Sequence, residues 1–259
     1  MVTKNQFKFI NSLKQKKSRE EYNLFIAEGA KIVPELLQSN IKIKQVFATS
    51  EFFKKNKLDT SIERFEVKIG ELERLSLQMT PNEVLAVCEI PKYEFNRNKL
   101  NDKLTLILDD IKDPGNLGTI IRIADWFGIE TIICSNETVD AFNPKVVQST
   151  MGSIARIELH YMDLVSLFGE LKEISSEGSS LPIYGALLDG NNIYQSKLSA
   201  NGCIVIGNES KGISNSILPF ITDKINIPSF SHFKSGGGEA ESLNAAIATS
   251  IICSEFRRR

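Results

Sequence analysis

Five short, mostly apolar runs lie beyond residue 103, and segments long enough to form helices separate most of them. A strand that is apolar on both faces needs a cover on both faces, and a parallel sheet between two layers of helices provides it. The sequence therefore predicts a parallel α/β domain over residues 104–259. Its predicted strands are Leu104–Leu108, Thr131–Cys134, Ile183–Leu188, Cys203–Ile206 and Lys224–Ile227.

Residues 1–93 have the pattern of a smaller α/β domain. An amphipathic helix is predicted from Asn5 to Lys16, and a second helix opens at Gly29 and runs through Leu37. Residues 94–103 are polar and follow no sustained period, so they are predicted to be a linker. The predicted strands of this first domain are Leu24–Ala27, Lys44–Ala48, Arg64–Val67 and Val84–Cys88.

Composition excludes several classes of protein. Apolar residues make up 42% of the chain, which is too many for a disordered segment. No run reaches the ~18 apolar residues of a membrane helix, and the first residues lack the apolar block of a secretory signal. A soluble, cytoplasmic protein with no membrane partner is therefore expected. The two histidines and four widely spaced cysteines form no metal-ligand pattern, and the thiols are expected to be buried and inert.

Positive charge gathers at both ends of a chain whose net charge is only −1. Residues 1–19 contain no acidic side chain, and the chain ends in Arg257, Arg258 and Arg259. Clusters of this kind attract a phosphate backbone, although a solvated helix face and a frayed terminus would have the same composition. The cations of the first segment are Lys4, Lys8, Lys14, Lys16, Lys17 and Arg19.

A first motif spans residues 106–124, where a strand ends in two acidic residues and an Asp-Pro-Gly turn follows. Asn116 is predicted to cap the next helix. Arg122 would then lie about a turn and a half into it, near an end that attracts anions. There it could hold a phosphate or polarise a hydroxyl, or simply pair with Asp125 at the surface. The predicted buried stripe of this helix is Leu117, Ile120, Ile121 and Ala124.

A second motif is the turn after the strand Cys203–Ile206. Gly207 and Gly212 allow a flat ligand to approach the backbone. Lys211 precedes Gly212 instead of following it, so this is not a P-loop, and no GxGxxG occurs in the chain. Glu209 could accept a hydrogen bond from a ligand or from Arg122, or it could be an exposed turn carboxylate.

A third motif begins at Ile227-Pro228 and ends at Ser242-Leu243-Asn244. A helix is predicted to begin near Ser242, which is a good N-cap, and its apolar face would continue through Leu243, Ile247 and Ile251. Thirteen residues, 229–241, separate the two halves of the motif and include three consecutive glycines. We interpret them as a flexible insert, in which His232 or Lys234 could contact a ligand, or which could be a loop with no such role.

In this order, the three motifs resemble the signature motifs of the SpoU (TrmH-like) RNA 2′-O-ribose methyltransferases of the SPOUT superfamily. The first third also resembles the small substrate-binding domain that often precedes that catalytic domain, through FIAEGAKIVPELL and PNEVLAVCEIP. The resemblance implies a catalytic domain with a C-terminal trefoil knot, which is an exception to the usual topology of protein chains. It also implies S-adenosylmethionine as cofactor. The matching positions are Asn116, Gly118, Arg122, Ala124, Gly207, Glu209, Gly212, Ile227, Pro228, Ser242, Leu243 and Asn244.

The resemblance also assigns roles. Gly207, Ile227 and Leu243 would bind the cofactor, with Leu187 as a fourth contact. The family works as homodimers in which Arg122 would face the cofactor pocket of the other subunit. Arg122 would orient and activate the ribose hydroxyl, and the residues that would hold it and the ribose in place are Asn116, Glu209, Ser242 and Asn244.

The expected substrate is RNA. The separate N-terminal domain favours ribosomal RNA, and the segment from Lys4 to Arg19 would help to hold it. Ribose methylation of transfer RNA remains an alternative. So do a non-catalytic RNA-binding protein of the same fold and a base methyltransferase on the same scaffold.

Overall fold

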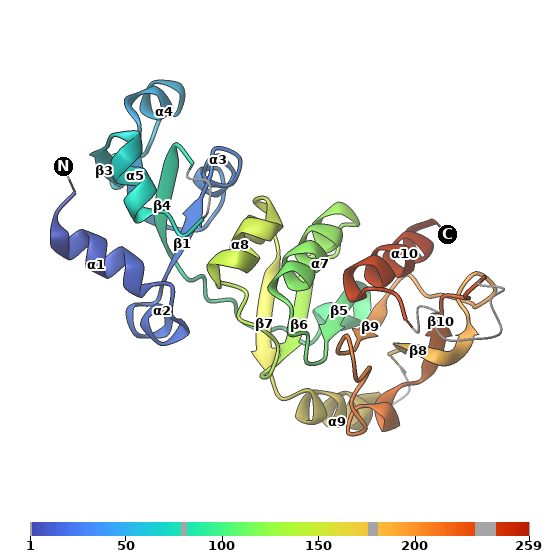
Figure 1. Cartoon of the computed structure of the whole chain (residues 1–259). Helices are drawn as coiled ribbons and strands as arrows, with labels where there is room; N and C mark the ends of the chain where they lie inside the picture. The colour runs from blue at the N-terminus through green and yellow to red at the C-terminus, as the bar shows by residue number, and fades with distance from the viewer. Residues whose placement is uncertain (1, 79–81, 176–180, 231–241, 259) are drawn as a thin grey trace. The chain divides into compact units, whose positions relative to one another are not determined.

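The computed structural model describes residues 2–78, 82–175, 181–230 and 242–258. Two compact units are formed (Figure 1). The first contains Met1–Lys92 and Asp140–Arg156, and the second contains Tyr93–Val139 and Ile157–Arg259. Each unit is described by itself.

The first unit is built on a mixed sheet of four strands in the order β1-β4-β2-β3, in which only β2 and β3 are parallel. The first helix is capped by Thr3, whose hydroxyl accepts from the backbone N–H of Gln6, and it buries Ile10 against the core. The elements are α1 (Lys4–Ser12), α2 (Lys16–Tyr22), β1 (Leu24–Glu28), α3 (Ile32–Leu37), β2 (Ile43–Ala48), α4 (Ser50–Lys55), β3 (Glu63–Glu66), α5 (Ile69–Leu75) and β4 (Val84–Glu89).

A later segment, residues 140–156, also belongs to this first unit. It carries α8 (Pro144–Thr150) and a short 3-10 helix, η1 (Ser153–Ala155). The guanidinium of Arg19 donates through Nε to the carboxylate of Asp140 at 2.9 Å, and the rings of Phe25 and Phe142 lie 4.9 Å apart. These contacts lie on the β1 side of the first unit, and the boundary at residue 104 expected from the sequence stays a prediction.

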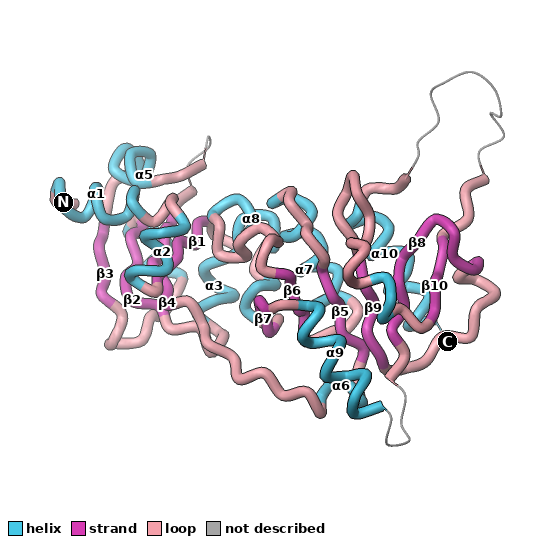
Figure 2. Tube along the Cα trace, turned by 90° about the horizontal axis from the view of Figure 1, so that it is seen from below, coloured by secondary structure: helices cyan, strands magenta, loops and turns pink. Residues whose placement is uncertain are grey.

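The second unit contains a parallel sheet of six strands in the order β10-β8-β9-β5-β6-β7 (Figure 2). Three of its strands, β5, β6 and β9, are wholly buried, as continuous apolar runs predict. The elements are α6 (Lys99–Asp102), β5 (Leu104–Leu108), α7 (Pro114–Trp126), β6 (Thr131–Ser135), β7 (Glu158–Met162), α9 (Leu164–Ser175), β8 (Ile183–Asn192), β9 (Gly202–Ile206), η2 (Leu218–Phe220), β10 (Asp223–Asn226) and α10 (Ala245–Arg258).

Helices cover both faces of this sheet (Figures 1 and 2). On one face, Phe168 of α9 and Leu100 of α6 pack with Ile107, Ile133 and Val205 of the central strands. On the other face α7 and α10 pack against each other. They run parallel, because Asn244 bonds to Asn116 where they begin, and Arg257 bonds to the carbonyls of Phe127 and Gly128 where they end.

The predicted strands are all present, with ends that differ by a few residues. One strand was missed: β7 mixes polar and apolar residues, because it lies at the edge of the sheet. The predicted linker is partly ordered, since it contains α6 and the ring of Phe95 packs on His160 at 5.2 Å. The predicted knot depends on the path of residues 231–241, which are outside the described residues, and it stays a prediction.

No helix in the described part of the chain is long and apolar enough to cross a membrane. All four cysteines are reduced and buried, as expected. Burial raises the pKa of the Cys134, Cys203 and Cys253 thiols to about 12, so these groups stay protonated and unreactive at neutral pH.

Candidate active site

The first and second motifs begin at the carboxyl ends of two neighbouring strands. Strands β5 and β9 are paired so that Leu108 faces Ile206, and the N–H of Asp109 donates to the Ile206 carbonyl at 2.9 Å. The first and second motifs therefore leave the sheet side by side. This is the edge at which parallel α/β sheets bind their ligands.

A chain of side-chain hydrogen bonds joins one residue from each motif. The amide Nδ2 of Asn116 donates to Oε1 of Glu209 at 2.9 Å, and Oδ1 of Asn116 accepts from Nδ2 of Asn244 at 2.8 Å. The Glu209 carboxylate also accepts from the backbone N–H groups of Lys112 and Asp113 at 3.4 and 3.3 Å. Asn116 is thus held from both ends, and Glu209 is fixed over the turn that precedes α7.

The prediction that Asn116 caps the helix of the first motif is wrong. The N-cap is Asp113, whose carboxylate accepts from the Asn116 N–H at 2.8 Å, and Pro114 occupies the first helical position. Asn116 therefore lies inside the first turn, and its side chain is free to bond to Glu209 and Asn244. The predicted buried stripe of α7 is confirmed at Leu117, Ile120, Ile121 and Ala124.

The third motif needs a similar correction. Asn244, and not Ser242, caps α10: its Oδ1 accepts from the N–H groups of Ala246 and Ile247 at 2.9 and 3.3 Å. Ser242 and Leu243 precede the helix and are exposed. The apolar face predicted through Leu243 and Ile247 is also wrong, since both are about half exposed. The buried face of α10 is formed by Ala245, Ala246, Thr249, Ile252, Cys253, Glu255 and Phe256.

The turn of the second motif is closed by Asn208, a residue that the sequence analysis did not single out. Its backbone exchanges two hydrogen bonds with Gly212, and its Oδ1 accepts from the N–H groups of Ser210 and Lys211. Gly207 has no room for a side chain, because a Cβ there would lie 2.2 Å from the carbonyl carbon of Gly212. An asparagine followed by a polar, glycine-containing turn was the available signal for this residue.

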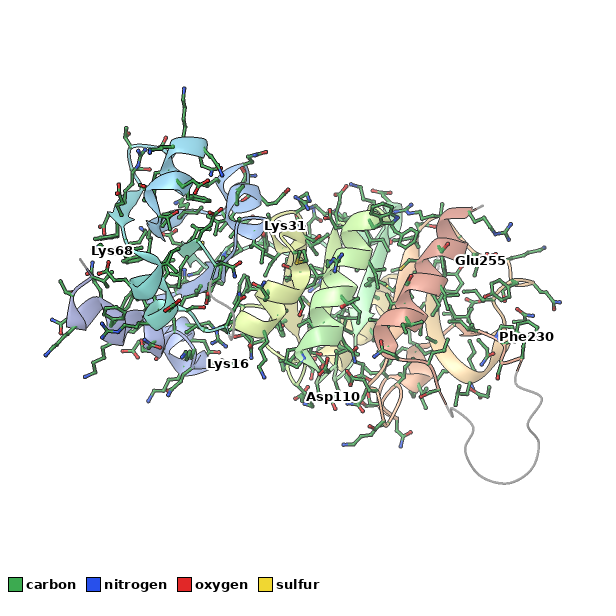
Figure 3. All side chains as sticks on the ribbon, turned by 45° about the horizontal axis from the view of Figure 1, so that its top comes forward. Lys16, Lys31, Lys68, Asp110, Phe230 and Glu255 are labelled. Atoms are coloured by element: carbon green, nitrogen blue, oxygen red, sulfur yellow. The ribbon has the colours of Figure 1, made fainter. Side chains whose placement is uncertain are left out.

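Asn208 also ties the second motif to the first. Its amide donates to the carbonyl of Asp110 at 2.8 Å. Asp110 has a positive φ of 63°, a conformation that few residues other than glycine, asparagine and aspartate adopt readily. The residue is labelled in Figure 3. Its carboxylate forms an ion pair with Lys112 at 2.5 Å, so the two turns are joined by main-chain and side-chain contacts together.

Arg122 is not part of this network. Its side chain is exposed on α7, and within the described part of the chain it is not bonded to Asn116, Glu209, Ser242 or Asn244. Because the helix begins at Pro114, Arg122 lies ~12 Å along the axis, which is beyond the first turn, where the helix end attracts anions. The prediction that Arg122 lies near the end of the helix that attracts anions, which assumed that Asn116 is the cap, is therefore wrong.

The predicted cofactor contacts Leu187 and Ile227 are half-buried at neighbouring strands, β8 and the end of β10. Leu187 packs against the core, while Leu188 beside it is 75% exposed. Asn226 was missed by the sequence analysis: its amide donates to the carbonyls of Leu187 and Leu188 at 3.2 and 2.8 Å. A lone asparagine in a strand gave no signal for this long-range contact.

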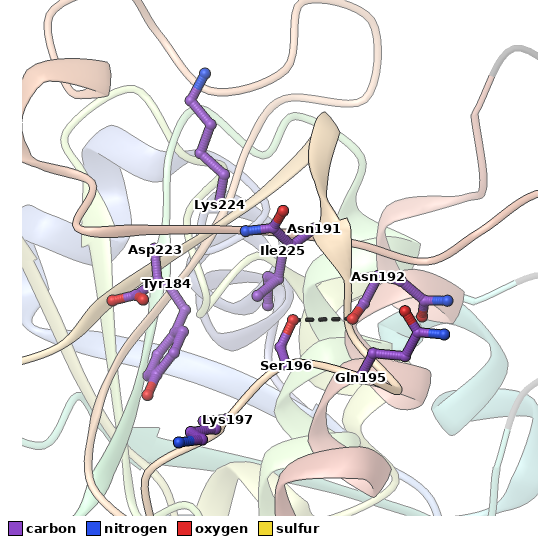
Figure 4. A pocket seen from close by; sticks show the side chains of 9 residues that line it. All are labelled: Tyr184, Asn191, Asn192, Gln195, Ser196, Lys197, Asp223, Lys224 and Ile225. Atoms are coloured by element: carbon purple, nitrogen blue, oxygen red, sulfur yellow. Dashed lines mark hydrogen bonds between the residues drawn. The ribbon is translucent and has the colours of Figure 1, made fainter.

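A polar pocket of about 390 Å³ lies against β8 and β10 (Figure 4). Its charged lining residues are Lys197, Asp223 and Lys224, and the Ser196 hydroxyl on its wall donates to the Asn192 carbonyl at 2.9 Å. None of the predicted site residues lines it. The pocket is therefore separate from the network that joins the motifs.

The predicted basic ends are only partly available to a ligand. Lys16, from the predicted N-terminal cluster, is exposed on the first unit, as are Lys31 and Lys68 outside that cluster (Figure 3). Arg19, however, is 2% exposed, because its guanidinium bonds to Asp140 and to two backbone carbonyls. Arg257 and Arg258 also have partners within the second unit, and Arg259 lies outside the described residues, as do His232 and Lys234.

Known proteins resemble this chain in sequence and in fold. The model of the SpoU rRNA Methylase family matches residues 103–254, and that of the MRM3-like substrate binding domain matches residues 4–86. The 23S rRNA (guanosine(2553)-2′-O)-methyltransferase RlmP of Bacillus subtilis is 31% identical over 95% of this chain and 93% of its own.

Solved structures of methyltransferases have a similar fold. A TrmH-family protein from Porphyromonas gingivalis superposes with a TM-score of 0.87 at 35% identity, covering 100% of this chain and 99% of its own. An AdoMet-bound rRNA methyltransferase from Sinorhizobium meliloti has a TM-score of 0.81 at 28% identity, covering 100% and 96%. The fold class expected from the sequence, a small α/β domain before a parallel-sheet catalytic domain, is confirmed.

Proposed function

This chain belongs to the SpoU rRNA methylase family, and on that premise we propose that it methylates a ribose 2′-hydroxyl of ribosomal RNA with S-adenosylmethionine. The observation that carries the proposal is the hydrogen-bond chain from Glu209 through Asn116 to Asn244. It brings together polar residues from all three motifs at the ligand-binding edge of the sheet. We propose that it acts in the cytoplasm.

The residues at this edge fit the cofactor. Leu187 and Ile227 provide half-buried apolar surface, Leu243 adds an exposed leucine, and Gly207 is a half-buried glycine whose main chain lies against that of Gly212, in a turn that admits no Cβ. Aliphatic side chains with a few main-chain polar groups are a common lining of ligand pockets. When bound, S-adenosylmethionine supplies a methyl group on a positively charged sulfur.

The polar residues would position the ribose. A ribose hydroxyl is a weak nucleophile until a hydrogen bond or a base activates it. The Arg122 guanidinium can donate to that hydroxyl or to an adjacent phosphate, and its fixed charge favours the alkoxide that develops. The network of Asn116, Glu209 and Asn244 supports the turns around the reacting atoms, and Ser242 lies next to Asn244.

We also propose that the active site is completed in a homodimer. Arg122 is exposed and does not reach the network of its own chain, so a second chain is needed to bring the two together. Trp126, one turn further along α7, is 85% exposed, and Ile247 on α10 is 54% exposed. Because α7 and α10 pack side by side, their exposed apolar residues offer a surface for a second copy of the chain.

The test is a methyl-transfer assay on ribosomal RNA with radiolabelled S-adenosylmethionine. Nuclease digestion and mass spectrometry of the nucleosides should find the methyl group on ribose. A methyl group on a base, or no transfer to ribosomal RNA but transfer to transfer RNA, would contradict the proposal. Arg122→Ala should bind cofactor normally and lose turnover. Near-normal turnover in that variant would remove Arg122 from the mechanism.

A further inference from the structure

The pairing of β8 with β10 breaks in the middle. Gly185 faces Lys224, but the next residue of β10, Ile225, faces Asn191. Residues 186–190 of β8 therefore have no opposite residues on β10. Leu187, one of the predicted cofactor contacts, lies in this unpaired stretch, so the shape of the stretch is not set by the regular ladder of the sheet.

The side chain of Asn226 bonds to this stretch in place of the ladder. Its Nδ2 donates to the carbonyl of Leu187 at 3.2 Å and to that of Leu188 at 2.8 Å. Asn226 is also the last residue of β10, and Ile227, a second predicted cofactor contact, follows directly. One amide thus fixes the spacing between the main chain at Leu187 and the main chain at Ile227.

The far end of the stretch is closed tightly. A Cβ at Gly190 would lie 2.6 Å from the carbonyl carbon of Ile225 and 2.8 Å from its nitrogen. The two backbones are in contact there, so the stretch cannot relax by sliding along β10. Its central part is held by the Asn226 amide at Leu187 and Leu188, and by an exposed ion pair, 2.6 Å long, between Asp189 and Lys224.

We propose that Asn226 is a positioning residue for the cofactor, which holds the Leu187–Leu188 main chain at the correct distance from Ile227. The inference rests on the proposed function, since it takes S-adenosylmethionine as the ligand of these residues. Asn226 does not touch the reacting atoms. Its loss should weaken cofactor binding and leave the methyl-transfer step itself unchanged once the cofactor is bound.

The test compares wild type with Asn226→Asp, which keeps the shape of the side chain but replaces the donor with an acceptor facing two carbonyl oxygens. Isothermal titration with S-adenosylmethionine and with S-adenosylhomocysteine should show dissociation constants raised about tenfold or more, as expected for two lost hydrogen bonds. In steady-state assays KM for the cofactor should rise, while kcat at saturating cofactor should stay close to wild type. Asn226→Gln keeps an amide donor and should recover part of the affinity.

Asn201→Asp is the matched control, because the Asn201 amide also donates to a backbone carbonyl, that of Asn101, but outside the predicted site. It should bind cofactor as wild type does. The inference is overturned if Asn226→Asp binds as tightly as wild type, or if the Gln variant shows no recovery and all Asn226 variants lose affinity only in step with their thermal stability. Wild type that binds no S-adenosylmethionine would instead refute the proposed function.

Discussion

Asn116 uses both ends of its amide, and the partners at the two ends come from different motifs. Asn116→Asp would place a carboxylate against Glu209 and remove the donor to it. We expect turnover to fall about 100-fold, the cost of misplacing reacting groups by about an ångström. Cofactor affinity should change much less. The measurement is kcat with saturating cofactor and RNA.

Asn136→Asp is the control for this variant, because Asn136 is exposed in the turn after β6 and should tolerate the change. If Asn116→Asp turned over at the same rate as Asn136→Asp, the network would have no part in positioning the substrate.

The motif residues could be found in the sequence, but their contacts could not. Asn116, Glu209 and Asn244 were each identified from local pattern and family resemblance. Asn116 and Asn244, however, are separated by 128 positions, and no local rule predicts a bond across that distance. Asn226 was missed for the same reason. Its role depends on a break in strand pairing that hydrophobic pattern does not record.

Glu28 gives a prediction on pH. Its carboxylate is buried in the first unit and accepts from the Ser76 hydroxyl at 2.6 Å and the Leu77 N–H at 2.8 Å. Burial raises the pKa of this group above its ordinary value of 4.5, and this effect outweighs the hydrogen bonds, which lower it. The folded state therefore holds the proton more tightly than the unfolded state does.

The contribution of this proton to stability is complete below pH 4.5 and is lost as pH rises through the raised pKa. We expect Glu28→Gln to remove that dependence, so that the unfolding free energy of wild type relative to the variant declines as pH rises above 4.5. Urea unfolding of both proteins across this range measures it. Glu66→Gln, on an exposed position of the same sheet, should keep the wild-type slope. If the unfolding free energy of wild type relative to Glu28→Gln instead increased with pH, the raised pKa assigned to Glu28 would be wrong.

Helix α10 gives a prediction at the scale of an element. Because Asn244 bonds to the first free N–H groups of the helix, Asn244→Ala should lower the free energy of unfolding by about 1 kcal/mol. Ser242→Ala is a matched control two residues earlier, and it should change stability by less than about 0.5 kcal/mol. Urea unfolding at one pH compares them. Equal losses would mean that both residues cap the helix.

Elements were easier to predict than their ends. The buried strands of the second unit are continuous apolar runs, and the sequence analysis found them because both faces are covered. Edge strand β7 mixes its residue types and was missed. The caps were wrong for a different reason: Asp113 and Asn116, like Ser242 and Asn244, are both good capping residues. Which residue of each pair caps the helix depends on where the helix begins. For α7, Pro114 occupies the first helical position, so Asp113 is the cap.

At the scale of the molecule, local charge was a poor guide to function. Arg19 was grouped with the exposed lysines as a possible RNA contact, yet it is a buried ion-pair partner that binds residues 140–156 to the first unit. The rest of the N-terminal cluster remains exposed at Lys4, Lys8, Lys14, Lys16 and Lys17. Only these lysines are available to an RNA backbone from that segment.

The proposed homodimer is best tested by mixing two inactive variants. Arg122→Ala leaves the cofactor residues intact, whereas Gly207→Ala forces a Cβ into the backbone of Gly212 and should close the cofactor turn. If Arg122 serves the pocket of the partner subunit, a mixed dimer contains one site with both an intact pocket and an intact arginine. If Arg122 serves its own subunit, the mixed dimer contains none.

Random pairing of equal amounts makes half of the dimers mixed, each with one working site of two, so activity should recover to about a quarter of wild type. The variants are dissociated, mixed and reassociated, and methyl transfer to RNA is then measured alongside the mass of the assembly by light scattering. Trp126→Glu, which places a charge on the exposed face of α7, should yield monomers and prevent the recovery. Mixtures that are dimeric but inactive would show that Arg122 acts within its own chain.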